Sequence, residues 1–92
     1  MEGELLEDHG GQEEARDACL SRHVVSLDDG RSAPDRIGHE AASACGPEND
    51  RLIRAMSTVD PSGVPQIADA VRKDSVVKAT SYVLEARAQA RR

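Results

Sequence analysis

The feature of this sequence that most constrains its fold is the placement of its two cysteines around a turn. Cys19 and Cys45 are the only cysteines among the 92 residues, and each lies thirteen positions from residue 32, just past the turn-forming residues 28–30. In an antiparallel helical hairpin, positions equidistant from the turn face each other. A disulfide across the hairpin is therefore sterically reasonable if the two Cα atoms come within about 4.4–6.8 Å.

Apolar side chains recur at helical spacing on both sides of this turn. Before it, residues 11–27 begin with acidic residues, which suit a helix N-terminus. Their apolar face is approximated by Ala15, Ala18, Cys19, Val25 and Leu27. After the turn, Pro34 favours the first turn of a second helix. The stripe of that helix consists of Ile37, Ala41, Ala44 and Cys45, which follow the period of an α-helix.

The rest of the chain is divided by glycine and proline. Gly46-Pro47 interrupts the second stripe, which resumes in phase at Leu52, so a kinked continuation and a clean break are both open. We predict one all-α domain over residues 1–92, with about three to four helices, a disulfide staple and an extended C-terminal helix. Its parts are an N-terminal arm (1–10), a helical hairpin (11–59), a turn (60–65) and the C-terminal helix (66–92).

The chain has few large side chains with which to fill a core. It contains no Phe or Trp, and Tyr82 is its single aromatic residue. Aromatic residues normally contribute the largest buried areas, so a chain of this size needs help from a crosslink or a partner. This favours a disulfide between the two cysteines over two buried thiols, although the sequence leaves both interpretations open.

A metal site is the third interpretation of the cysteines. Cys19 and His23 are four residues apart on one helix, and His39 and Cys45 could complete a Cys2His2 set. However, Cys45 comes six residues after His39, and this separation places the two side chains roughly 240° apart around a helix. We therefore expect no metal site. The absence of a Cys-x-x-Cys pair also gives a thioredoxin-like redox site no support.

Charge and motifs narrow the class of function. Residues 1–60 carry 14 acidic and 6 basic residues, whereas residues 61–92 carry 3 and 6, which gives the net charge of −5. This balance disfavours nucleic-acid binding, which needs a dense basic patch, and counts against a small DNA-binding regulator. No phosphate-binding, dinucleotide-binding or nucleophile-elbow motif is present. We expect no enzyme, no catalytic residue, no cofactor and no small-molecule substrate.

The sequence does not identify a compartment. It has neither a signal-peptide pattern nor an apolar run long enough to span a membrane, so we expect no membrane partner. A disulfide would suit an extracellular or virion setting.

The C-terminal helix is the best candidate for binding a partner. Its seam consists of Val76, Ala79, Val83, Ala86 and Ala90, with Leu84 beside it, and has the 3–4 spacing of a heptad repeat. This seam could pack on the chain's own hairpin. Because the hairpin offers little volume, we expect another chain to bury the seam and the turns from Leu84 onward to overhang the hairpin.

The resulting hypothesis is a non-enzymatic structural or accessory protein. It would dock by helix packing onto other protein chains, which could be copies of itself, in a larger assembly such as a multi-copy phage virion or a bacterial surface component. The alternative hypothesis is a small acidic regulator or inhibitor that binds a single protein partner, which the acidic residues 1–60 favour.

Overall fold

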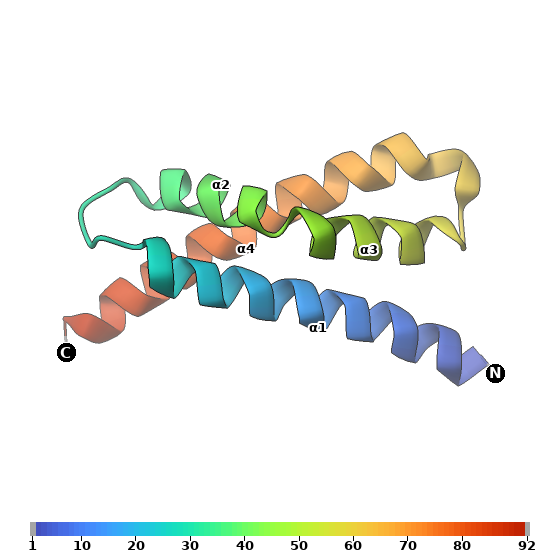
Figure 1. The fold of residues 1–92 in the computed structure, drawn as a ribbon, viewed down its shortest axis with the longest axis horizontal. Helices are drawn as coiled ribbons and strands as arrows, with labels where there is room; N and C mark the ends of the chain where they lie inside the picture. Colours follow the sequence, from blue (N-terminus) through green and yellow to red (C-terminus); the bar gives the residue numbers. More distant parts are fainter. Residues whose placement is uncertain (1, 92) are drawn as a thin grey trace.

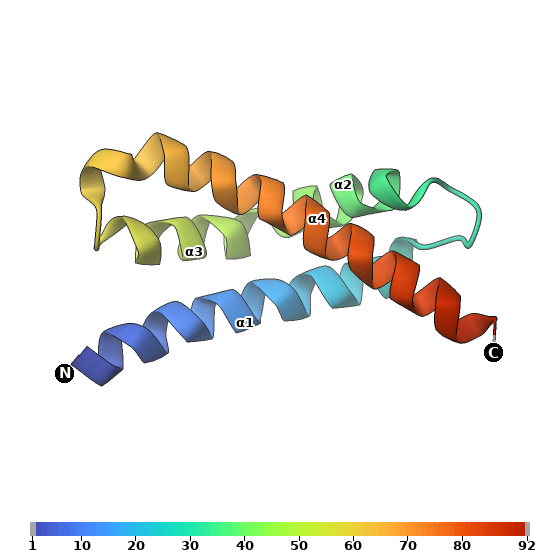
Figure 2. The same ribbon diagram turned by 180° about the vertical axis from the view of Figure 1, so that it is seen from behind.

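The computed structural model describes the backbone of residues 2–91 and the side chains of residues 10–91. The elements, in chain order, are helix α1 (Glu2–Leu27), α2 (Pro34–Ala44), α3 (Gly46–Ser57), the 3₁₀ turn η1 (Pro61–Gly63) and α4 (Val64–Ala90). α2 and α3 follow one another along one line, α1 runs beside them, and α4 crosses the bundle (Figures 1 and 2). The start of α1 and the end of α4 lie at opposite ends of the molecule (Figure 1). The all-α prediction with a long C-terminal helix is confirmed.

Two boundaries differ from those expected. Helix α1 begins at Glu2, so residues 2–10 continue the first helix where we expected a separate arm. Helix α4 begins at Val64, two residues before the predicted start, because η1 occupies the first part of the predicted turn and leads directly into the helix.

The α1–α2 turn is built from aspartate side chains that bind backbone amides. The Asp29 carboxylate accepts hydrogen bonds from the backbone N–H of Ser32 (2.7 Å) and of Arg31 (2.9 Å), which lower its pKa. Asp28 accepts one from Gly30 N–H at 2.9 Å. Gly30 has a φ of 76°, which side chains disfavour and glycine adopts freely. The turn predicted from residues 28–30 is therefore present.

A single residue separates α2 from α3. Cys45 leaves helical geometry at φ −99° and ψ 28°, yet its N–H still donates to the carbonyl of Ala41. Pro47 lies in the first turn of α3, where its missing N–H breaks no helical hydrogen bond. The interruption is thus a short break after which the chain keeps nearly the same direction (Figure 1).

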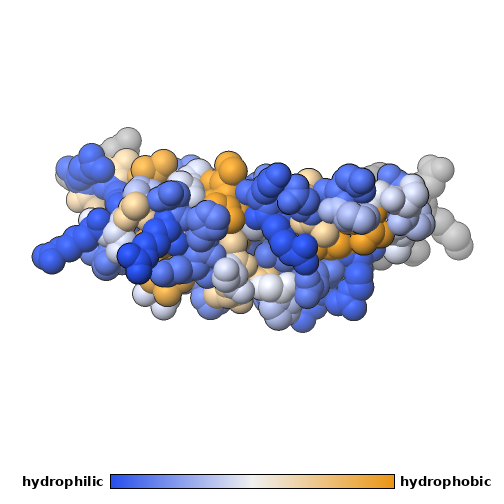
Figure 3. All heavy atoms as spheres, turned by 90° about the horizontal axis from the view of Figure 1, so that it is seen from above, coloured by the Kyte–Doolittle hydropathy of each residue, from blue (hydrophilic) through white to orange (hydrophobic). Residues whose placement is uncertain are grey.

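The interior consists of two apolar clusters with a polar layer between them. The larger cluster, which contains the cysteines, is formed by Cys19, Leu20, Val24, Ile37, Ala41, Ala42, Cys45, Ala79 and Val83. The smaller cluster is formed by Leu52, Ile53 and Val71. Three buried polar residues lie between these clusters along the helices: Arg16, Asn49 and Ser75. On the face of the molecule that Figure 3 shows, hydrophobic side chains form small separate groups among mostly hydrophilic ones.

The buried face of α1 differs from the predicted one. Three residues assigned to it are exposed: Ala15, Ala18 and Val25. The face keeps Cys19, as predicted, and otherwise carries Arg16, which is 1% exposed, with Leu20 and Val24. The predicted face included only apolar residues, whereas hydrogen-bond partners on α4 allow Arg16 to be buried.

The pairing of α2 and α3 explains how a core with few large residues covers the long helix α4. Together these helices, of 11 and 12 residues, lie along most of its 27 residues. At the α2–α4 contact, a Cβ on Gly38 would lie 3.0 Å from the Val76 carbonyl oxygen and overlap the Thr80 side chain. The absent side chain therefore allows the two helices to approach closely.

The end of α4 is held to the α1–α2 turn. The Arg87 guanidinium donates to Asp28 Oδ1 at 2.7 Å and to the Ser32 carbonyl oxygen at 2.6 Å. The expectation that α4 overhangs the hairpin from Leu84 onward was therefore wrong, since this contact fixes the helix as far as Arg87.

Candidate functional site

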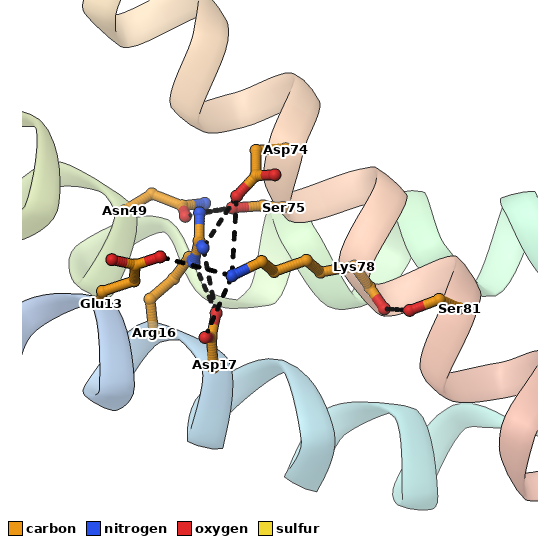
Figure 4. Close-up of polar contacts among 8 residues, drawn as sticks. All are labelled: Glu13, Arg16, Asp17, Asn49, Asp74, Ser75, Lys78 and Ser81. Atoms are coloured by element: carbon orange, nitrogen blue, oxygen red, sulfur yellow. Dashed lines mark hydrogen bonds and ion pairs between the residues drawn. The ribbon is translucent and has the colours of Figure 1, made fainter.

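The buried polar layer is centred on the guanidinium of Arg16. Its Nη2 donates to Asp74 Oδ2 at 2.9 Å, its Nη1 to Ser75 Oγ at 3.2 Å, and its Nε to Asp17 Oδ1 at 3.0 Å. Ser75 in turn donates to Asn49 Oδ1 at 2.6 Å (Figure 4). The layer thus joins α1 to α4 through charge-assisted hydrogen bonds, and the neutral Ser75–Asn49 hydrogen bond adds α3.

Lys78 extends this network toward solvent. Its ammonium group lies 3.2 Å from Asp17, 3.5 Å from Glu13 and 3.9 Å from Asp74 (Figure 4). Partial burial opposes the charge on Lys78, but the hydrogen bond to Asp17 and the neighbouring carboxylates outweigh it, so the pKa of Lys78 is raised. Lys78 therefore stays charged at neutral pH.

This network has the properties of a structural element. Each of its charged groups lies within 4.0 Å of an opposite charge. Within residues 10–91, no buried side-chain nitrogen or oxygen is left without a hydrogen-bond partner. The raised pKa of Lys78 lies farther from neutrality than that of a free lysine, whereas a general acid or base works best near the working pH. The ion pairs of Arg16 and Lys78 hold α1 against α4.

An open groove of about 340 Å³ lies beside this network. Four apolar residues line this groove: Leu52, Met56, Ala70 and Val71. Three charged residues complete the lining: Glu13, Arg16 and Asp74. This volume is at the low end for small-molecule sites. Because Arg16 and Asp74 are already paired with each other, a polar ligand would have to compete with an existing ion pair.

The predicted partner-binding seam of α4 is divided between the core and the surface. Ala79 and Val83 are fully buried in the larger apolar cluster, and Val76 packs against it. The expectation that another chain buries these residues was wrong, because the chain's own helices cover them, with α2 forming the most extensive contact. The other predicted residues are exposed: Leu84, Ala86 and Ala90.

Two helices carry apolar residues that the fold leaves uncovered. On α4, Val77 is 65% exposed and Leu84 is 53% exposed. With Ala70 and Ala88, also exposed, they form the outer α4 face, which lies opposite the buried seam by helical periodicity. The outer α1 face consists of Ala15, Ala18 and Val25. Within residues 2–91, no helix is both long and apolar enough to cross a membrane.

The cysteine pair lies in the larger cluster. Cys19 of α1 is bonded to Cys45 at the α2–α3 junction, with their Cα atoms 6.0 Å apart, so the pairing predicted from their symmetry about the turn is present. The ligand atoms of Cys19, Cys45 and His23 all lie within 4.8 Å of one another. His39, the fourth residue considered from the sequence, is exposed and is not part of this group.

Sequence reasoning missed the polar layer, although a signal for it is present. Arg16 is one helical turn before Leu20, and Ser75 is one turn before Ala79. Each polar residue thus continues the buried stripe of its helix into the polar layer.

Comparisons of the chain with protein-family models, with curated proteins and with solved structures find no match.

Proposed function

We propose that this chain is a non-enzymatic structural or accessory protein that docks by helix packing in a multi-copy assembly. The docking surface is the outer α4 face, and the surface that receives it is the outer α1 face of the next copy. A phage virion or a bacterial surface structure is the kind of assembly that such a chain would serve.

The observation that carries this proposal is the exposure of Val77 and Leu84. They are seven residues apart on the side of α4 that faces away from the core, and both are more than half exposed. In a chain with few large apolar residues, leaving two of them in water sacrifices burial that the core could use. A partner helix would recover that burial.

The outer α1 face suits this role in size and spacing. Ala18 and Val25 are also seven residues apart and exposed, so the two faces share one repeat. Small alanine side chains allow a close approach of the helix backbones. The charge asymmetry adds to this, because the acidic residues 1–60 and the basic residues 61–92 of neighbouring copies attract each other.

A contact between two different faces repeats from copy to copy. It forms a ring if the rotation that relates each copy to the next closes on itself, and a filament if it does not. Sedimentation velocity over a range of protein concentrations tests this directly. We expect the Val77→Asp/Leu84→Asp variant to remain monomeric where the native chain assembles. We expect Val25→Asp, on the opposite contact face, to have the same effect.

Val59→Asp is the matched control, since Val59 is 79% exposed but lies on neither face. This variant should assemble like the native chain. A native chain that stays monomeric at every concentration would refute docking between copies. If the double variant still assembled while retaining its helical circular dichroism, the outer α4 face would not be the contact surface.

A further inference from the structure

His23 lies beside the disulfide in a position that suits a metal ligand. It follows Cys19 by one turn of α1, so both side chains project toward the same side of the helix. Cys45 reaches this place from the α2–α3 junction, and the three potential ligand atoms lie within 4.8 Å of one another. Three soft or borderline donors from two chain segments thus converge on one point.

A zinc ion requires adjustments of about 1–2 Å from these separations. In a tetrahedral site, with Zn–S near 2.3 Å and Zn–N near 2.0–2.1 Å, neighbouring ligand atoms are about 3.6–3.8 Å apart. The two sulfurs would have to separate by less than about 2 Å from their covalent distance. Cys45 can allow this movement because it is the non-helical residue between α2 and α3.

We propose that the reduced form of this chain binds Zn²⁺ through Cys19 Sγ, Cys45 Sγ and a ring nitrogen of His23. An external dithiol reduces the Cys19–Cys45 bond by supplying two electrons and two protons. The two cysteines become thiols, and the external dithiol becomes a disulfide. Zinc binding then releases both thiol protons to solvent, and a water molecule fills the fourth position.

The burial of the site favours this ion. Cys19 is 2% exposed and Cys45 is fully buried, so two thiolates without a cation would be costly there. Two thiolates, one divalent cation, a neutral imidazole and water have no net charge. His23 is only half-buried, which leaves a solvent side from which the ion and the water can enter.

The consequence is a crosslink between α1 and α2 in both redox states. Under oxidising conditions the crosslink is the covalent bond, and under reducing conditions it is the metal. The proposal does not depend on docking between copies, since it concerns the buried side of α1.

Cobalt titration tests the site, because tetrahedral Co²⁺ with thiolate ligands absorbs in the visible and Zn²⁺ does not. The chain is reduced with a phosphine, which leaves no competing dithiol, and titrated without oxygen. We expect thiolate–cobalt bands that saturate at about one ion per chain and disappear when Zn²⁺ displaces the cobalt. The oxidised chain should give no such bands. Zinc should also raise the melting temperature of the reduced chain.

His23→Ala should weaken cobalt binding by at least about tenfold, because one of three protein ligands is lost. His39→Ala is the matched control and should titrate like the native chain, since His39 is not in the group. Circular dichroism of both variants checks that they are folded, and His23→Gln provides a second variant if His23→Ala is not. A reduced native chain without cobalt bands would overturn the proposal, and so would a folded His23 variant with unchanged affinity.

Discussion

Replacing Arg16 with methionine tests whether the polar layer stabilises the bundle. Methionine keeps an unbranched side chain of similar length, so the variant removes the charge and the hydrogen bonds while filling much of the space. Replacing a whole buried ion pair with apolar residues is often neutral or stabilising, but removing one partner leaves the others uncompensated. We therefore expect Arg16→Met to be destabilising.

The structure sets the size of this effect. Ser75 is fully buried and loses a donor, which costs about 1 kcal/mol. Asp17 and Asp74 have side chains that are 28% and 49% exposed, so water and Lys78 limit the cost to about 0.5 kcal/mol each. The total is about 2 kcal/mol. For a chain of 92 residues with an unfolding entropy of about 0.19 kcal/mol/K, this corresponds to a fall in melting temperature of about 10 °C.

Chemical and thermal unfolding followed by circular dichroism measure this difference. The matched control is Arg36→Met on α2, where the arginine side chain is 74% exposed and pairs with Glu40 at 3.6 Å. We expect that control to change the free energy of unfolding by less than about 0.5 kcal/mol. An Arg16→Met chain as stable as the native one, or more stable, would refute the argument that the buried charge of Arg16 holds α1 against α4.

Three further predictions concern other contacts of the fold. Gly38→Ala should lower the free energy of unfolding by about 1–3 kcal/mol because the added methyl group meets α4. Gly11→Ala is the control, since Gly11 has open space around it, and should raise the free energy of unfolding by about 0.5–1 kcal/mol. Equal effects of the two substitutions in urea titrations would contradict this. Reducing the disulfide in metal-free buffer should destabilise the chain by about 3.5 kcal/mol, which is the loop-closure value for a separation of 26 residues. This corresponds to a fall in melting temperature of about 18 °C. A fall of less than about 3 °C would count against a stabilising role of the disulfide. The hydrogen bond from Arg87 lowers the folded-state pKa of Asp28 below its ordinary 3.8. The stability from this pair is therefore present above about pH 4 and is lost as the pH falls toward the folded-state pKa of Asp28. Arg87→Met should flatten this part of a plot of the urea midpoint against pH, and an unchanged plot would exclude the pair as the cause.

The parts of this fold that could be predicted from the sequence depend on local signals. The turn at residues 28–30 comes from aspartate and glycine chemistry within a few residues, and the pairing of Cys19 with Cys45 follows from simple symmetry about it. The stripe through Ile37 and Leu52 kept its phase because apolar residues mark it on both sides of the break.

The parts that could not be predicted depend on distant partners. Arg16 can be buried because Asp74 and Ser75, 58 and 59 residues away, accept its hydrogen bonds. The helical spacing shows that Arg16 continues the buried stripe but not which distant groups pair with its charge, and the predicted face of α1 was placed toward Ala15 and Ala18. Cys19, His23 and Cys45 could be grouped from the sequence, whereas the fourth ligand considered there, His39, is exposed and lies outside the group.

The division of the interior by a polar layer has a consequence for local unfolding. The smaller apolar cluster contains three buried residues from α3 and α4, and no disulfide ties α3 to α4. The larger one contains nine, and the disulfide within it prevents α1 and α2 from separating. An opening that peels α3 from the start of α4 exposes much less apolar surface than one at the other end. Amide hydrogens of α3 would then exchange with solvent through local unfolding at a low free-energy cost, whereas those of α2 would exchange only through global unfolding. We therefore expect the end of the bundle around the smaller cluster to open more readily than the end that holds the disulfide, with the groove beside Arg16 at the boundary between them.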